Sequence, residues 1–244
     1  MNHQETLENY ISCLTDIKKR TEVIRRILNN IVLEDDVVTV EILALQFRKV
    51  FELIALTGIV ANREKYAEIN KDFHKNYHAR NIIKSLKEIN PDFFPVPVRG
   101  EKTGTYNNGQ HSNYVMEKLG KGALTENQLT NYWDRCGSLL HATNPYGEPK
   151  KIKQTLKVMP DWLGGIVKLL NSHNSMGING EYMIAATMQS EKTGAVHAAF
   201  FEKLVGSTVL DSGEIIGNKK PPEGGFKFDA SYVHPVPFKK CKPF

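Results

Sequence analysis

An arginine and a histidine lie six positions apart in one polar stretch of the chain, NYWDRCGSLLHATNPYG. His141 can take or give a proton near neutral pH, because the imidazole group titrates there. Arg135 can hold a phosphate group and offset the charge that develops on it during a reaction. Six residues turn an ideal helix by about 600°, so the two side chains leave one helix about 120° apart. They would meet more readily across a twofold axis, with Arg135 of one chain facing His141 of another.

This stretch is predicted to be the end of an amphipathic helix. Thr125 followed three positions later by Gln128 forms a capping box, which predicts the first turn of the helix. Pro145 forces Asn144 out of helical geometry, so we expect the helix to end at about His141. Tyr146 follows in the turn after the helix.

Two stripes divide the surface of this helix. The apolar stripe should face the core and contains Leu129, Trp133, Cys136 and Leu140. In that position Cys136 is expected to be a small buried hydrophobe rather than a reactive thiol. The second stripe is polar or small and contains Asp134, Gly137, Ser138 and His141, with Asn131 and Arg135 on its flank. Because Gly137 has no side chain, another backbone could approach closely there, as it would if a second helix crossed at this point.

The first half of the chain also predicts helices. A periodic apolar pattern covers residues 6–30, and the most apolar segment of the chain, residues 37–62, should be a central core helix. A third helical stretch runs from about Tyr66 to Ile89, with a possible break near Asn76, and prolines stop it at NPDFFPVPV. A further helix covers about Lys150 to Leu170, where Pro160 predicts a kink or a break.

The remaining segments predict strands and loops. Residues 99–124 are rich in Gly, Asn and Lys and suggest a hairpin or a long loop. GEYMIAATMQ and AVHAAFFEKL, separated by SEKTG, predict an antiparallel β-hairpin, and a Gly- and Pro-rich extended tail follows from Ile215. The expected fold is mainly α. Residues 1–174 form a helical domain, and residues 175–244 add the hairpin and the tail, packed on the same domain.

Composition narrows the classes of function. The 244 residues are enough for one large domain, and the formal net charge of +5 permits an acidic or nucleic-acid partner. Three widely spaced cysteines (Cys13, Cys136 and Cys241) give neither a disulfide framework nor a zinc-ligand pair, which favours a reducing cytoplasm. No apolar run is long enough for a signal core or a membrane span. His74 and His78 have the i, i+4 spacing of helical metal ligands, but no third ligand accompanies them, so we expect surface histidines and no metal or cofactor.

Taken with its context, the pair Arg135 and His141 resembles the R-x4–6-H motif of HEPN domains. The similarity extends to ALQFRKVFELIALTGIVANREKY, INPDFFPVPV and RCGSLLHATNPYG, and it would cover about residues 1–172. It implies a helical bundle that forms homodimers through the motif helices. In active members, paired arginines and histidines make a metal-independent endoribonuclease site, often in toxin or anti-phage systems. By this resemblance Arg135 and His141 would be catalytic. Asn131, Asp134, Ser138, Asn144 and Tyr146 are the candidates to support them.

Two positions depart from the family pattern. Active members usually carry a polar residue directly after the arginine, where this chain has Cys136. The tyrosine that one toxin subgroup has two places after the histidine is replaced by Thr143. Three interpretations therefore stay open. One is an RNA-cleaving homodimer, with a protein inhibitor or antitoxin as a further partner. The second is a non-catalytic dimeric module that binds RNA, a nucleotide or a protein. In the third, Arg135 pairs with a carboxylate and His141 interacts with the helix dipole, so both only stabilise the helix in a protein of unrelated function.

Overall fold

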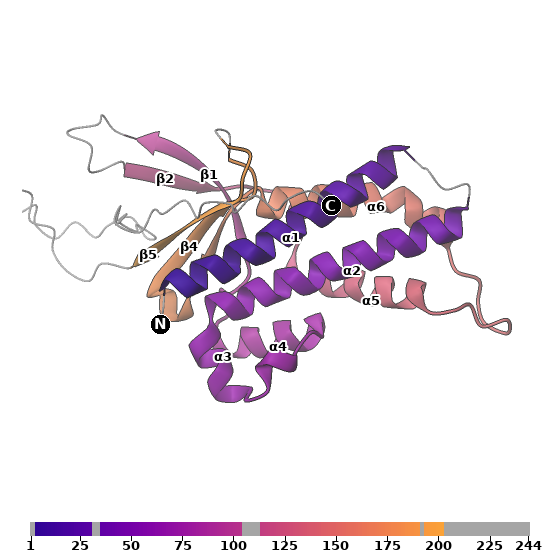
Figure 1. The fold of residues 1–244 in the computed structure, drawn as a ribbon, viewed down its shortest axis with the longest axis horizontal. Helices are drawn as coiled ribbons and strands as arrows, with labels where there is room; N and C mark the ends of the chain where they lie inside the picture. The colour runs from indigo at the N-terminus through magenta and orange to yellow at the C-terminus, as the bar shows by residue number, and fades with distance from the viewer. Residues whose placement is uncertain (1–2, 31–34, 104–112, 191–192, 203–244) are drawn as a thin grey trace, which may run out of the picture.

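The computed structural model describes residues 3–30, 35–103, 113–190 and 193–202 and is mainly helical (Figure 1). Its α-helices are α1 (His3–Asn30), α2 (Asp36–Ala61), α3 (Arg63–Ile69), α4 (Ala79–Ile89), α5 (Glu126–Leu140) and α6 (Ile152–Leu170). Five strands form one antiparallel sheet in the order β2-β1-β3-β4-β5. They are β1 (Val96–Thr103), β2 (Asn113–Lys118), β3 (Ser172–Met176), β4 (Tyr182–Thr187) and β5 (His197–Glu202). The sheet lies at the end of the helical layer where α1 begins (Figure 1).

Helix α2 is the centre of the core, as its apolar sequence predicts. Asp35 caps it by accepting hydrogen bonds from the backbone N–H groups of Val37 and Val38. Buried side chains then cover most of its circumference, with Phe47 and Phe51 among those completely buried. Because α1, α5 and α6 all pack against this helix, it fixes how the helix that carries Arg135 and His141 is oriented.

The third helical stretch is interrupted where the sequence suggested it. Helix α3 ends at Ile69, a short 3₁₀ turn covers Phe73–Lys75, and α4 starts at Ala79. The 3₁₀ turn contains His74, whereas His78 lies in extended backbone before α4. The two histidines therefore do not share a helix face. Across the described part of the chain, no group of three or more His, Cys, Asp or Glu side chains is placed to hold a metal ion.

The sheet joins the C-terminal hairpin that the sequence predicts to three further strands. Strands β4 and β5 pair as expected, from Tyr182 opposite Glu202 to Thr187 opposite His197. Strand β3 was missed, because its sequence SHNSM is mostly polar and has no alternation of apolar and polar residues to mark a strand. It pairs with β4 and also with β1, so the predicted domain boundary after residue 174 falls inside a strand of a continuous sheet. Strands β1 and β2 form the hairpin suggested for residues 99–124.

Helix α6 continues through Pro160 without the break that was one of the two expectations there. Pro160 is exposed, while Met159 and Trp162 on either side of it are buried in the core. Packing of these neighbours holds both halves of the helix in place, which offsets the hydrogen bond that proline cannot donate. The tail predicted from Ile215 onward lies outside the described residues.

Candidate functional site

Helix α5 begins and ends where the sequence predicts. The backbone N–H of Gln128 donates to Thr125 Oγ1 at 3.3 Å, and the N–H of Thr125 donates to Gln128 Oε1 at 3.0 Å. This reciprocal pair is the predicted capping box. The helix ends at Leu140, and His141 is its C-cap with an extended backbone. The cap and the terminus thus place Arg135 inside the helix and His141 at its end.

The apolar stripe of α5 is confirmed at three of its four positions. Leu129, Trp133 and Cys136 are buried, but Leu140 is 37 % exposed and the neighbouring Leu139 is buried in its place. The prediction for Leu140 is wrong because the chain enters a loop directly after it, and residues 141–149 are all exposed. Among the described residues, the loop that follows leaves the last position of the stripe partly exposed.

Cys136 is enclosed between α5 and its neighbours. Its side chain is fully buried, and burial raises the pKa of the thiol to about 12, against the opposing effect of Arg48 and Arg135. Because the thiolate is the reactive form of cysteine, this thiol is inert near neutral pH. The prediction of a buried hydrophobe at Cys136 is confirmed.

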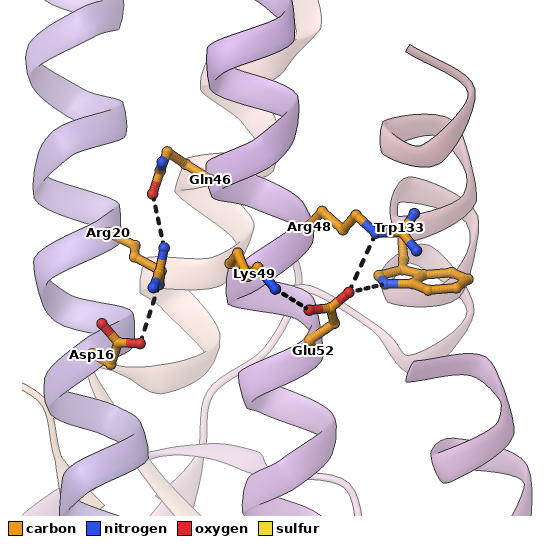
Figure 2. A network of polar contacts seen from close by, with 7 residues as sticks. All are labelled: Asp16, Arg20, Gln46, Arg48, Lys49, Glu52 and Trp133. Atoms are coloured by element: carbon orange, nitrogen blue, oxygen red, sulfur yellow. Dashed lines mark hydrogen bonds and ion pairs between the residues drawn. The ribbon is translucent and has the colours of Figure 1, made fainter. Parts of the chain in front are cut away.

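Where α5 packs against α2, the buried carboxylate of Glu52 interacts with three donor side chains (Figure 2). Glu52 is 6 % exposed and accepts a hydrogen bond from Trp133 Nε1 at 3.3 Å. Arg48 Nε and Lys49 Nζ each form an ion pair with it at 3.3 Å. The guanidinium of Arg48 also lies over the Trp133 ring, with Cζ 4.1 Å from the centroid. A buried carboxylate needs such partners, so this network ties α2 to α5.

A second network in the same view joins α1 to α2. Arg20 Nε pairs with Asp16 at 3.2 Å, and its Nη1 donates to Gln46 Oε1 at 3.1 Å (Figure 2). These partly exposed contacts add to the packing of the two long helices, but they do not reach α5.

Another part of the chain approaches α5 closely at Gly137, as its missing side chain suggested. A Cβ atom added there would lie 2.6 Å from Arg48 Nη1, a distance that real Cβ atoms do not reach. The group that uses this space within the chain is therefore an arginine side chain from α2. Within one chain this space is used by the Arg48 side chain rather than by another backbone, and a crossing by a helix of a second subunit stays a prediction.

Arg135 lies on the opposite side of α5, facing α6. Its Nη2 donates to the hydroxyl of Thr155 at 2.8 Å, and its Cζ lies 5.5 Å from the centre of the Trp162 ring. Trp162 also stacks on Tyr132 at 4.4 Å. Among the ion pairs of the described residues, none involves Arg135. Its positive charge is therefore held in place by a hydroxyl and an aromatic ring rather than by a carboxylate.

His141 lies in solvent at the C-terminal end of α5. Lys150 donates from Nζ to the backbone carbonyl of Leu139 at 2.8 Å and also to that of His141. A lysine in this position donates to backbone carbonyls that have no partner within the helix, and its positive charge is stabilised by the negative end of the helix dipole. Lys151 and Lys153 follow it in the sequence and are exposed, as is Glu148 in the loop before them.

The supporting residues lie at different places around α5. Asn131 and Ser138 are exposed, and Ser138 donates to the backbone carbonyl of Asp134 at 3.2 Å. The carboxylate of Asp134 pairs with Arg80 of α4. In the turn after the helix, Asn144 Oδ1 accepts from the backbone N–H of Tyr146 at 3.0 Å, and Tyr146 is 97 % exposed. Asp134 is thus already neutralised, whereas Tyr146 offers a free aromatic face.

Within one chain, the structure does not bring Arg135 and His141 to a common partner. Arg135 contacts α6, and His141 extends into solvent where the helix ends. This agrees with the angle of about 120° that the six-residue spacing predicts for one straight helix.

Sequence reasoning missed a buried polar cluster between α1 and the sheet. Tyr10 Oη lies 2.9 Å from His173 Nε2 and 2.7 Å from Ser175 Oγ, while His173 Nδ1 lies 2.9 Å from the carbonyl oxygen of Leu170. Burial lowers the pKa of His173 to about 4 and raises that of Tyr10 far above its ordinary value. Tyr10 and His173 are 163 positions apart, so no local pattern could have revealed the cluster. Because all three groups are enclosed and hydrogen-bonded, they stabilise the fold.

Comparisons with protein-family models, with curated proteins and with solved structures gave no match to this chain. In the described residues, no helix is both long enough and apolar enough to span a membrane.

Proposed function

We propose that the end of helix α5 binds RNA and that two copies of the chain form a metal-independent endoribonuclease. In this proposal the helical part is a HEPN-like bundle, and Arg135 of one chain acts beside His141 of the other. The observation that carries the proposal is the exposed imidazole of His141 at the end of α5, where Lys150 donates to the backbone carbonyl of His141. Arg135, which forms no ion pair among the described residues, supports it.

The chemistry needs only groups that this region can supply. The ribose 2′-oxygen attacks the neighbouring phosphorus, and the bond from phosphorus to the 5′-oxygen breaks. A neutral imidazole takes the proton of the 2′-hydroxyl, and an imidazolium gives a proton to the leaving 5′-oxygen. The products are a 2′,3′-cyclic phosphate and a 5′-hydroxyl. Because the attacking oxygen belongs to the RNA, neither a metal ion nor a protein nucleophile is required.

The side chains around His141 suit RNA as a ligand. Lys151 and Lys153 are exposed and can neutralise backbone phosphates. Tyr146, at 97 % exposure, can stack on an unpaired base. A twofold axis would form two equivalent sites, each with Arg135 of one chain beside His141 of the other. In each site one imidazole can take the proton of the 2′-hydroxyl and then give it to the leaving 5′-oxygen. A role in a toxin or anti-phage system, a cytoplasmic location and an inhibitory protein partner belong to the same proposal.

A second candidate is a dimeric module that binds RNA, a nucleotide or a protein without cleaving it. The contact from Arg135 to Thr155 favours it, because an arginine held inside its own chain contributes to stability even when no substrate is present. The buried Cys136, at a position where active HEPN domains usually carry a polar residue, points the same way.

Cleavage of labelled RNA in the presence of EDTA separates the two candidates. We expect the wild-type chain to cut the RNA and His141→Ala to lower the rate by about 10²–10⁴-fold, the usual contribution of a general acid or base. The matched control is His74→Ala, which removes another exposed histidine far along the chain and should leave the rate unchanged. If the folded wild-type chain leaves RNA intact, the enzyme proposal is wrong.

A further inference from the structure

Three positions on α5 form a row that leads from the core to solvent. Trp133, Gly137 and His141 are spaced four residues apart, and residues at this spacing lie on the same face of a helix. Trp133 is buried, Gly137 is half-buried and His141 is exposed. Four residues rise by about 6 Å, so the space beside Gly137 lies about one helical turn from the start of the His141 side chain.

The cation that lies on this row is Arg48 of α2. Its Nη1 lies 2.6 Å from where a Cβ of residue 137 would be, so a side chain there would require it to shift, and its guanidinium is stacked on Trp133. Arg135, by contrast, points to Thr155 on the α6 side. Of Arg48 and Arg135, the one that lies beside the row of Trp133, Gly137 and His141 is therefore Arg48, which the motif does not include.

The donors of Arg48 are only partly used. Its Nε is paired with Glu52, while no hydrogen bond to its Nη1 or Nη2 is found in the described part of the chain. The side chain remains 26 % exposed, so water or a ligand can reach it. Glu52 is shared with Lys49, and the three groups together keep one positive charge. Figure 2 shows the guanidinium over the Trp133 ring, with its Nε joined to Glu52.

We propose that Arg48 is a second phosphate-binding residue of the α5 site and holds the RNA phosphate on the same face as His141. The inference rests on the proposed function and adds to it Arg48, a residue from the same chain as the neighbouring His141. The Nη groups of Arg48 donate to non-bridging phosphate oxygens, while Glu52 and Trp133 hold the guanidinium plane in place. Gly137 leaves room for the guanidinium beside the helix, whereas a Cβ at this position would require the guanidinium to shift.

Two substitutions test this arrangement in independent ways. Arg48→Gln removes the charge and the donor fork. Gly137→Ala keeps Arg48 but places a Cβ where Nη1 lies, so the guanidinium must move. Each has a matched control. Lys49→Gln removes the other cation that pairs with Glu52, and Gly164→Ala adds a methyl group to a helical glycine that has open space around it.

The first measurement is kcat and KM for cleavage of a labelled RNA in EDTA. The second is the affinity for the same RNA, measured with each substitution combined with His141→Ala so that the RNA stays uncut. We expect Arg48→Gln to lower kcat/KM by about tenfold or more and to weaken RNA binding, as the loss of one phosphate contact should. Gly137→Ala should lower kcat/KM in the same direction. Arg48→Lys should restore part of the binding, which a merely structural role would not predict. Both controls should stay within about twofold of wild type, and circular dichroism confirms that each variant is folded.

The outcomes separate this inference from the function on which it rests. If the wild type cleaves RNA and folded Arg48→Gln matches Lys49→Gln in kcat/KM and affinity, Arg48 is only a structural residue and the inference is overturned. Should Arg48→Gln not fold, equal activity of Arg48→Lys, Gly137→Ala and wild type would overturn it as well. If the folded wild type neither binds nor cuts RNA, the proposed function fails, and the role of Arg48 fails with it.

Discussion

The buried cluster of Tyr10, His173 and Ser175 and the exposed end of helix α5 both contain a histidine and hydroxyl groups, but solvent reaches only one of them. In the cluster every polar group has a partner within the fold, and His173 is held neutral by burial. At the end of α5, His141 and Tyr146 lie in water. The comparison teaches that residue type alone does not locate chemistry. The same imidazole stabilises the fold in one region and is open to a substrate in the other.

The buried region should reveal itself through the pH dependence of stability. The pKa of His173 is about 4 in the folded chain, below its ordinary value of 6.5. Between these values the unfolded chain binds the proton more readily, so the free energy of unfolding falls as pH drops from about 6.5 towards 4. The loss attributable to this group approaches about 3 kcal/mol. Urea unfolding at pH 7, 5.5 and 4.5 measures it.

The comparison between regions supplies the control for this titration. His173→Gln should flatten the acid loss of stability, because no imidazole remains to be charged on unfolding. His141→Gln, at the exposed end of α5, should leave the acid loss as it is in wild type. If the stability of the two variants depends on pH in the same way, burial does not hold His173 neutral and the contrast with the exposed His141 is contradicted.

Arg135 is half-buried, so its exposure to solvent is intermediate between the buried cluster and the exposed end of α5. The substitution Thr155→Val tests how much its hydrogen bond stabilises the fold. Valine removes the hydroxyl that Arg135 contacts at 2.8 Å, in a position that is 1 % exposed. We expect a loss of about 1–2 kcal/mol in the free energy of unfolding, since water can still reach the half-buried guanidinium. Thr130→Val, on the outer side of α5, should change stability by less than about 0.5 kcal/mol. A loss of about 3 kcal/mol or more would instead place Arg135 with the buried network.

The sequence was informative wherever the signal was local. The capping box at Thr125, the buried Cys136 and the interruption before α4 are all properties of neighbouring residues, and the structure confirms them. The β4–β5 hairpin was also predicted, because its two apolar runs are separated by a short turn segment.

Features that depend on distant residues were not predicted. Strand β3 has a polar sequence and is a strand only because β1 and β4 pair with it. The space at Gly137 could be recognised, but its occupant, Arg48, is 89 positions earlier in the chain and had no motif to mark it. Leu140 was assigned to the core by periodicity alone, which cannot show that the covering elements end there.

The most direct test of the central claim is complementation between two inactive variants. Arg135→Ala and His141→Ala are each expected to be inactive alone, because each removes one half of a shared site. When the two are refolded together, half of the dimers are mixed, and each mixed dimer contains one site with both native residues. We predict that the mixture regains about a quarter of the wild-type rate of RNA cleavage. If mixed dimers form but the refolded mixture stays as inactive as the separate variants, the site is not shared between two chains.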